Sequence, residues 1–301
     1  MTLDLPALRD AVERHGPVVR VLVVATAGSA PREAGTSMLV WAGGAAGTIG
    51  GGALENEAVA WARAMLTGGV RIAREVVSLG PRLGQCCGGA VTLLWERFEA
   101  GSLPRGLPYA RWVDAPRGVP PVPPPGSPPV ERNGWIVEAK AGARAPLWVW
   151  GAGHVGRAIV GVLAPMPHLA VTWVDLGPEL FPDAVPAGVA AVPAAEPSAL
   201  VPFAPRDADH LVLTRSHAVD LALCDALLRH GFASLGLIGS GTKRARFRAR
   251  LAALGHAPAQ ISRIACPIGD PALGKHPQAI AVGVAAALLR GRGQAAGERA
   301  G

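Results

Sequence analysis

A glycine-rich turn in the second half of the chain restricts its fold more than any other feature. The apolar run Leu147–Trp150 predicts a short buried strand, and the pattern Gly-x-Gly-x-x-Gly follows it directly at residues 151–156. The next residues, Arg157–Leu163, have the pattern of a helix. A strand that enters a helix through such a turn is typical of dinucleotide-binding α/β domains. The glycines permit a tight turn, the approach of a phosphate, and close packing of helix on strand.

Strands and helices continue to alternate beyond this turn. Apolar runs that predict buried strands recur at 171–175, 211–214 and 235–238, with helical patterns between them. Alternation of this kind favours a parallel sheet with helices on both faces. We therefore predict a Rossmann-like, doubly wound α/β domain over residues 146–301.

An acidic residue at the end of the second of these strands extends the pattern. Asp175 stands where dinucleotide-binding domains place an acid that accepts a hydrogen bond from a ribose hydroxyl. The helix N-terminus after the turn offers free N–H groups to an anion. A Rossmann domain whose phosphate site is empty, or serves another ligand, is the alternative. The candidate ligand-binding residues of this region are Gly151, Gly153, His154, Gly156 and Asp175.

A further basic turn lies at Gly239–Arg244, between a predicted strand and a predicted helix. Its spacing is not that of a Walker A phosphate loop. Ser240 and Lys243 are still candidates for binding a phosphate, because a cationic side chain forms charge-assisted hydrogen bonds with phosphate oxygens. The alternative is a solvated basic helix face.

Residues 1–100 predict a smaller mixed α/β domain. Apolar runs that favour strands flank one longer helical pattern, and three consecutive glycines stand directly before that helix. Because a helix N-terminus attracts anions, Gly50, Gly51 and Gly52 are candidates for a second anion cradle. The alternative is a tight turn without a ligand.

Two adjacent cysteines mark another glycine-flanked loop in this first domain, at residues 84–89. Neighbouring cysteines are poorly placed to form a disulfide with each other. A thiolate is a nucleophile or a soft metal ligand, and flanking glycines let a bulky ligand approach. We interpret Gln85, Cys86 and Cys87 as a ligand loop, with the two thiols as candidate metal ligands. The alternative is a pair of small buried side chains.

Proline separates the two domains. The stretch Pro104–Pro129 contains the run Pro120–Gly126, which is five-sevenths proline and excludes a helix or a central strand. We predict a semi-rigid linker over residues 101–145. The alternative is a Pro-rich ligand for a partner protein.

Composition excludes several classes of protein. The net charge of +7 comes mainly from arginines spread along the chain, and no zinc-finger or RRM signature is present, so we expect no nucleic-acid partner. No apolar run reaches the roughly 18 residues that span a bilayer, and the N-terminal residues do not resemble a signal peptide. Four cysteines without framework spacing fit a reducing compartment, so we expect a cytoplasmic protein.

Taken in order, these motifs resemble the signature of the xanthine dehydrogenase accessory proteins, the XdhC/CoxI family. The resemblance covers nearly the whole chain except the proline-rich stretch. In the first domain it rests on Gly28-Ser29-Ala30-Pro31-Arg32, Gly35, Met38, Ile49-Gly50-Gly51-Gly52, Glu55 and Gly84-Gln85-Cys86-Cys87-Gly88-Gly89. In the second domain it rests on Gly151-Ala152-Gly153-His154-Val155-Gly156-Arg157, Thr214-Arg215-Ser216-His217, Asp220, Ile238-Gly239-Ser240 and Cys266-Pro267-Ile268-Gly269.

The resemblance implies a molybdenum cofactor chaperone without enzymatic turnover of its own. Such proteins bind a molybdopterin-type cofactor, protect it, support its sulfuration by a cysteine desulfurase, and pass it to xanthine dehydrogenase in purine catabolism. A soft thiolate suits molybdenum, which agrees with a metal site at Cys86 or Cys87. Whether the chain forms a homodimer is left open.

Two other functions compete with this interpretation. A nicotinamide-dependent oxidoreductase would use the glycine-rich turn and Asp175, but it would leave the cysteine loop unexplained. A thiol redox or metal-delivery module without pterin would use the cysteines alone.

Overall fold

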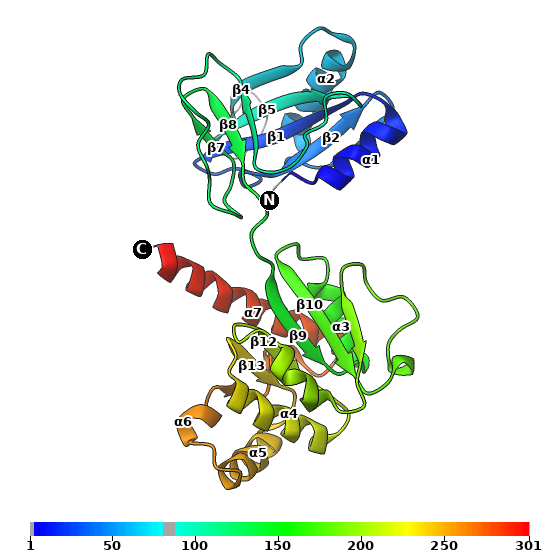
Figure 1. The fold of residues 1–301 in the computed structure, drawn as a ribbon, viewed down its shortest axis with the longest axis vertical. Coiled ribbons are helices and arrows are strands. Elements are labelled where there is room, and N and C mark those ends of the chain that lie inside the picture. Colours follow the sequence, from blue (N-terminus) through cyan, green and yellow to red (C-terminus); the bar gives the residue numbers. More distant parts are fainter. Residues whose placement is uncertain (1–2, 81–87, 301) are drawn as a thin grey trace. The chain divides into compact units, whose positions relative to one another are not determined.

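A computed structural model describes residues 3–80 and 88–300, with side chains up to Arg292. The chain forms two compact units, Met1–Ala143 and Arg144–Gly301 (Figure 1). The first unit is mixed α/β with antiparallel sheets, and the second contains a parallel sheet. The predicted fold class is therefore confirmed. None of the described helices is long and apolar enough to cross a membrane.

A five-stranded antiparallel sheet, in the order β3-β2-β1-β5-β4, forms the centre of the first unit. Its central strand β1 is rich in valine and alternates between two faces. Val19, Val21 and Val23 pack against α2, whereas Leu22 and Val24 belong to a separate cluster on the opposite face. The elements of this layer are α1 (Leu5–His15), β1 (Val18–Ala27), β2 (Ser37–Trp41), β3 (Gly44–Gly47), α2 (Gly52–Thr67), β4 (Ile72–Ser78) and β5 (Ala90–Phe98).

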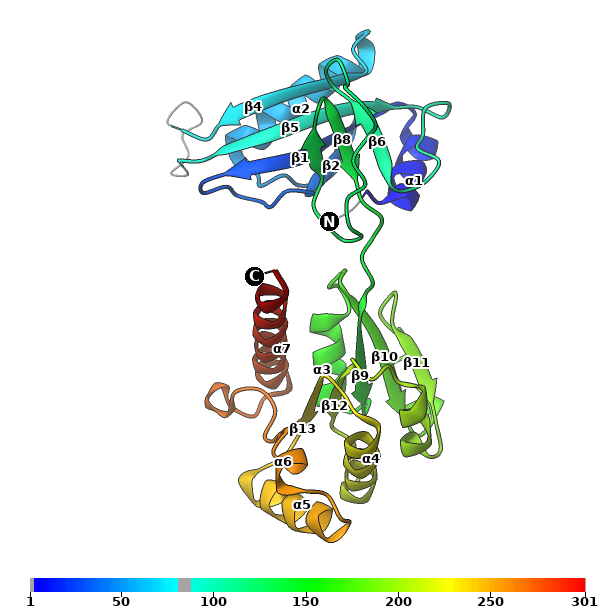
Figure 2. The same cartoon turned by 60° about the vertical axis from the view of Figure 1, so that its left-hand side comes forward.

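Part of the segment predicted as a linker forms strands. It contributes β6 (Tyr109–Trp112), β7 (Val130–Arg132) and β8 (Trp135–Glu138), which form an antiparallel sheet in the order β6-β8-β7. Figure 1 labels β7 beside β8, and Figure 2 labels β6 beside β8. Ile136 of β8 is fully buried in the cluster that contains Leu22. The linker prediction over residues 101–145 is therefore wrong for these strands, because the proline run occupies only the connection between β6 and β7.

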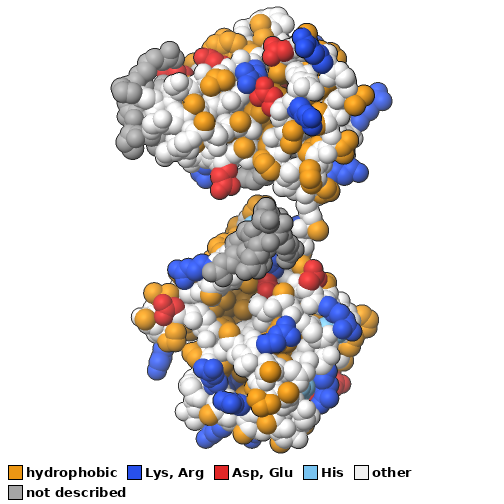
Figure 3. All heavy atoms as spheres, turned by 90° about the vertical axis from the view of Figure 1, so that its left-hand side faces the viewer, with side chains coloured by type: hydrophobic (Ala, Val, Ile, Leu, Met, Phe, Trp, Pro, Cys, Tyr) orange, Lys and Arg blue, Asp and Glu red, His pale blue; other side chains and the backbone are white. Residues whose placement is uncertain are grey.

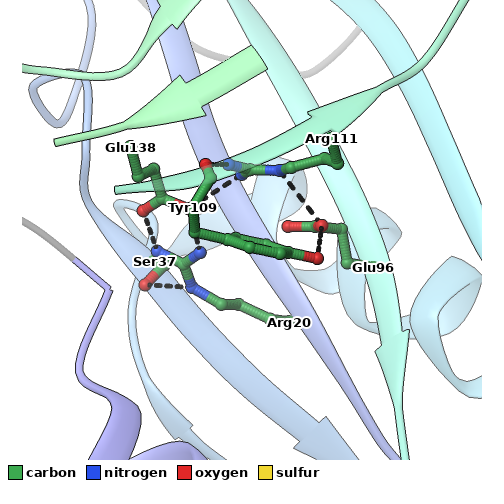
Figure 4. A network of polar contacts seen from close by, with 6 residues as sticks. All are labelled: Arg20, Ser37, Glu96, Tyr109, Arg111 and Glu138. Atoms are coloured by element: carbon green, nitrogen blue, oxygen red, sulfur yellow. Dashed lines mark hydrogen bonds and ion pairs between the residues drawn. The ribbon is translucent and has the colours of Figure 1, made fainter. Parts of the chain in front are cut away.

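A buried ionic network attaches this small sheet to the large one (Figure 4). Arg20 of β1 makes two hydrogen bonds of 2.7 Å to the carboxylate of Glu138. Arg111 forms ion pairs with Glu138 at 2.8 Å and with Glu96 at 3.0 Å. Burial opposes ionisation of Glu138, but the hydrogen bonds and charges of the two arginines outweigh it and lower the pKa of its carboxyl. The network therefore fixes β6 and β8 on the sheet.

The second unit is a six-stranded parallel sheet in the order β11-β10-β9-β12-β13-β14. From β9 the chain first adds β10 and then β11 on one side. It then returns and places β12 on the other side of β9. This change of direction is the topological switch point at which open α/β sheets bind ligands. The strands are β9 (Ala145–Trp150), β10 (Leu169–Asp175), β11 (Ala190–Pro193), β12 (Asp209–Val212), β13 (Ser234–Leu237) and β14 (Ile264–Ala265).

Helices cover both faces of this sheet, as the alternating sequence predicted. On one face, α3 and α7 pack together over Leu147 and Val149 of β9. On the other face, Trp148 and Trp150 of the same strand pack into the cluster that contains α4 and α5. The helices are α3 (His154–Leu163), η2 (Pro178–Leu180), η3 (Pro197–Phe203), α4 (His217–His230), α5 (Gly241–Ala253), α6 (Pro258–Ile261), η4 (Pro271–Leu273) and α7 (Pro277–Ala300).

Candidate functional site

The glycine-rich turn after β9 uses its three glycines for different purposes. A Cβ on Gly151, whose φ is 121°, would stand 2.5 Å from the carbonyl oxygen of Leu213. A Cβ on Gly156 would stand 2.0 Å from the carbonyl oxygen of Gly151. These two glycines therefore allow close packing within the protein. A Cβ on Gly153 would meet nothing within 4 Å, so this glycine faces open space at the start of α3.

The open space beside Gly153 is a small pocket, here called the glycine-turn pocket. Arg157, which lines it, donates from Nε to the carbonyl oxygen of Ala152 at 3.0 Å and from Nη2 to that of Leu180 at 2.9 Å. Glu179 is also part of the lining. The lining residues are Ala152, Gly153, His154, Arg157, Glu179, Leu180 and Arg215.

Asp175 holds the turn in place. Its Oδ2 accepts a hydrogen bond of 2.6 Å from the amide of Ala152, and its Oδ1 accepts one of 2.8 Å from the amide of Leu176. The side chain is buried. The sequence predicted an acceptor for ribose here, whereas the structure shows both carboxylate oxygens engaged by backbone amides.

A second pocket lies where α4 and α5 begin, at the carboxyl ends of β12 and β13; we call it the α4–α5 pocket. Ser216 and Ser240 cap the two helices, with hydroxyls that accept from the amides of Val219 at 3.4 Å and Lys243 at 3.3 Å. Arg215 lines both this pocket and the glycine-turn pocket. The lining residues are Thr214, Arg215, His217, Ile238, Gly239, Ser240, Thr242, Lys243, Arg246, Phe247 and Arg250.

Lys243, predicted to bind phosphate, is paired within the protein. Its Nζ lies 2.5 Å from Oδ2 of Asp220, whose side chain is fully buried. The other oxygen, Oδ1, accepts from the amide of Thr214 at 3.0 Å and from its hydroxyl at 2.7 Å. The lysine therefore neutralises a buried carboxylate, and Ser240 acts as a helix cap.

In the first unit, the predicted anion cradle contains a carboxylate of the chain itself. Oε2 of Glu55 accepts hydrogen bonds from the hydroxyl of Thr48 at 2.5 Å and from the amides of Ile49 and Gly51, both at 3.0 Å. The Thr48 hydroxyl is the main cause that lowers the pKa of the Glu55 carboxyl, and the amides add to it against the effect of burial. The amides of Ile49 and Gly51 thus bind a carboxylate of the chain itself, and binding of an external anion at residues 50–52 stays a prediction.

Three motif segments of the first unit meet at one end of the large sheet. A Cβ on Gly89 would stand 2.3 Å from the carbonyl oxygen of Ser29, and a Cβ on Gly50 would stand 2.7 Å from side-chain atoms of Pro31. Segments 28–31, 50–52 and 88–89 are therefore neighbours. The predicted ligand residues Gln85, Cys86 and Cys87 lie outside the described residues.

These features allow the chain to be compared with known proteins. A family model described as the XdhC Rossmann domain matches residues 147–288, and one described as the XdhC and CoxI family matches residues 11–78. The chain belongs to the XdhC and CoxI family. The resemblance seen in the sequence motifs is thereby confirmed.

Two proteins similar to this XdhC-family chain are informative. Uncharacterized protein YqeB of Escherichia coli K12 is 32% identical over 160 residues, which cover 52% of this chain and 29% of YqeB. The chain thus spans less than a third of that relative's length. A crystal structure from Bacillus halodurans, described as a xanthine dehydrogenase, matches with a TM-score of 0.71 at 18% identity, over 98% of this chain and 96% of that one. At this identity the likeness shows a shared fold alone.

The arginines of the α4–α5 pocket were not among the predicted ligand-binding residues. Arg246 and Arg250 lie in a basic helix, and Arg215 stands in the motif Thr214–His217, for which no ligand role was predicted. Only the packing of α5 beside the loop after β12 brings the three into one lining. Their spacing of four residues along α5 was the one available signal, since it places Arg246 and Arg250 on the same helix face.

The two cysteines described in this XdhC-family chain are buried and free. Burial is the main cause that raises the pKa of the Cys224 thiol to about 12, so this thiol is unreactive at neutral pH. Among residues 3–80 and 88–300, no three His, Cys, Asp or Glu side chains gather as a metal site would require.

Proposed function

We propose that this chain binds a molybdopterin-type molybdenum cofactor, protects it, supports its sulfuration and delivers it to xanthine dehydrogenase. The observation that carries the proposal is that two models of one family match both units in order, at residues 11–78 and 147–288. The fold shared with the Bacillus halodurans protein described as a xanthine dehydrogenase supports it over nearly the whole chain. The protein would act in the cytoplasm as an assembly chaperone, with a cysteine desulfurase as a second partner.

Residues of the second unit fit an anionic, phosphate-bearing ligand. In the second unit, Gly153 leaves room for a ligand at the start of α3, next to His154 and Arg215. In the first unit, Gly89, which lies against Ser29, follows Cys87 by two residues in the sequence. When bound, the cofactor supplies the molybdenum centre that accepts sulfur. This chain's part is to hold the phosphate, to offer thiolates to the metal and to release the ligand.

The proposal is tested by measuring what the purified protein carries. The full chain is produced with added molybdate, and molybdenum per protein and fluorescent pterin after oxidation are measured together with activation of cofactor-free xanthine dehydrogenase. We expect Cys86→Ala or Cys87→Ala to reduce molybdenum content and activation. Cys224→Ala, which changes a buried core thiol, is the control and should resemble the wild type. Absence of molybdenum and pterin from the wild-type protein would refute the proposed function.

One observation favours a second candidate, a nicotinamide-dependent oxidoreductase. The strand order β11-β10-β9-β12-β13-β14, with a glycine-rich turn at the end of β9, is that of dinucleotide-binding sheets. The engagement of Asp175 by two backbone amides argues against it, because this acid is the usual ribose acceptor. Fluorescence titration with NADH decides between the two functions: tight binding with hydride transfer to a small carbonyl would favour the oxidoreductase.

A further inference from the structure

The α4–α5 pocket has a lining that attracts anions. Three arginines, Arg215, Arg246 and Arg250, contribute to it, and its described lining includes no Asp or Glu. None of the ion pairs formed among the described residues involves these three arginines. On the face of the second unit that Figure 3 shows, Lys and Arg side chains are more frequent than acidic ones.

The one buried acid near this pocket is already neutralised. Asp220 is fully buried. Its carboxylate forms an ion pair of 2.5 Å with the ammonium group of Lys243 and accepts two hydrogen bonds from Thr214. The Asp220–Lys243 pair therefore contributes little net charge. The positive charge of the three arginines remains available to a ligand.

Two helix N-termini add to this charge. The caps Ser216 and Ser240 each satisfy one amide of the first turn, of α4 and α5 respectively. Other first-turn amides of a helix have no acceptor within the helix, and they favour an anion. Since both helices begin at the same pocket, their amides and the arginines act on one volume of about 360 Å³.

The glycine-turn pocket is less suited to a doubly charged group. Its Arg157 is held by the carbonyl oxygens of Ala152 and Leu180, and Glu179 contributes a negative charge to the lining. Arg215 is the cation that the two pockets share. A ligand that extends from one pocket into the other would thus place its most anionic part beside α5.

We propose that the α4–α5 pocket, and not the glycine-rich turn, is the main phosphoryl-binding site of the second unit. The ligand is a phosphate or pyrophosphate ester whose phosphoryl oxygens bind Arg215, Arg246, Arg250 and the first-turn amides of α4 and α5. The remainder of the ligand extends past Arg215 toward Gly153. The assignment rests on the proposed function only for the identity of the ester, which would be the phosphate-bearing cofactor.

The test uses inorganic pyrophosphate as the probe and titration calorimetry of the full chain. Arg246→Ala and Arg250→Ala should each weaken binding by about tenfold, since each removes a charge-assisted hydrogen bond of the kind worth about 1.4 kcal/mol or more. Arg248→Ala is the matched control, because Arg248 lies on the same helix but lines other pockets. It should retain the affinity of the wild type.

Gly153→Val distinguishes the two pockets, since the added side chain enters the glycine-turn pocket alone. We expect it to bind pyrophosphate with less than a threefold change. The proposal is overturned if the wild type does not bind pyrophosphate, if the two α5 variants bind like the control, or if only Gly153→Val loses binding. Molybdenum content, measured separately, reports on the proposed function. A protein that carries molybdenum but shows unchanged pyrophosphate binding in the α5 variants would refute this site alone.

Discussion

The ammonium group of Lys243 lies 2.5 Å from the carboxylate of Asp220, a side chain with no exposed surface. The two residues come from different helices, α5 and α4, and the pair lies beside the α4–α5 pocket. A buried charge is costly unless it is paired and hydrogen-bonded, and Thr214 completes the set of partners. The pair therefore fixes the start of α5 relative to the loop after β12.

Removing the lysine should destabilise this region. Lys243→Met leaves Asp220 buried without its counterion, a change that costs about 3 kcal/mol of unfolding free energy. Hydrogen–deuterium exchange of the α4 and α5 peptides in the full chain measures the effect on this part of the fold. The double variant Asp220→Asn/Lys243→Met should regain much of the loss, because no unpaired charge remains. Equal protection in Lys243→Met and the wild type would show that the pair has no structural role.

The Arg20–Glu138 pair should be equally important in the first unit. Both side chains are almost completely buried, so Arg20→Met leaves the carboxylate of Glu138 with Arg111 as its remaining partner. We expect a loss of about 3 kcal/mol and faster hydrogen exchange in β8. Arg74→Ala is the control, because the Arg74–Glu131 pair is about 30% exposed on each side and should contribute less than about 1 kcal/mol. The prediction fails if the two variants lose the same stability.

The sequence predicted the second unit well because its signals are local. The turn at residues 151–156 and the alternation of strands and helices each depend on short segments. The Arg20–Glu138 pair is different, since its members are 118 residues apart and no local pattern relates them. For the same reason β6 and β7 were not predicted within residues 101–145, because the small sheet is held by contacts such as that of Ile136 with Leu22 of a distant strand.

In the candidate site, the packing role of the glycines could be predicted from the sequence, but the partners of the charged side chains could not. Gly151 and Gly156 are required by close backbone contacts, which the motif implies. The partners of Asp175, Glu55 and Lys243 depend on which groups the fold brings within hydrogen-bonding distance. Asp175 and Lys243 were predicted to lie near a ligand, and each is bound instead by groups of the protein. The amides predicted to bind an anion near residues 50–52 likewise bind Glu55.

His210 should make the stability of the second unit depend on pH. It is fully buried between β9 and β13, and Trp150 donates a hydrogen bond of 3.2 Å to its Nδ1. Burial, with a smaller effect of His230, lowers the pKa of His210 from 6.5 to about 4. The unfolded chain therefore binds a proton at this site at a higher pH than the folded chain does. The contribution of neutral His210 to the free energy of unfolding should be fully present above pH 6.5. It should fall by about 3 kcal/mol as the pH decreases to 4.

Urea unfolding between pH 4 and pH 8 measures this dependence. Replacing the histidine in His210→Gln should flatten the curve, whereas His168→Gln, which changes an exposed histidine, should leave it unchanged. The comparison uses the change of unfolding free energy with pH and not its absolute value, so a packing defect in the first variant does not affect the conclusion. Identical slopes for the wild type and His210→Gln would show that another group is responsible.

The glycines of the turn after β9 should differ sharply in their tolerance of substitution. Gly156→Val forces a side chain against the carbonyl oxygen of Gly151, where even a Cβ would be only 2.0 Å away. Overpacking of this kind costs roughly 1–3 kcal/mol or more, so the variant should lose protection in β9 and α3. Gly153 has an extended backbone, with φ −70° and ψ −176°, and open space around it, so Gly153→Val should keep the stability of the wild type to within about 0.5 kcal/mol. Thermal unfolding and hydrogen exchange of the two variants test the contrast. Equal destabilisation would show that Gly153 is also required for packing, and would remove the reason for regarding it as the open side of the glycine-turn pocket.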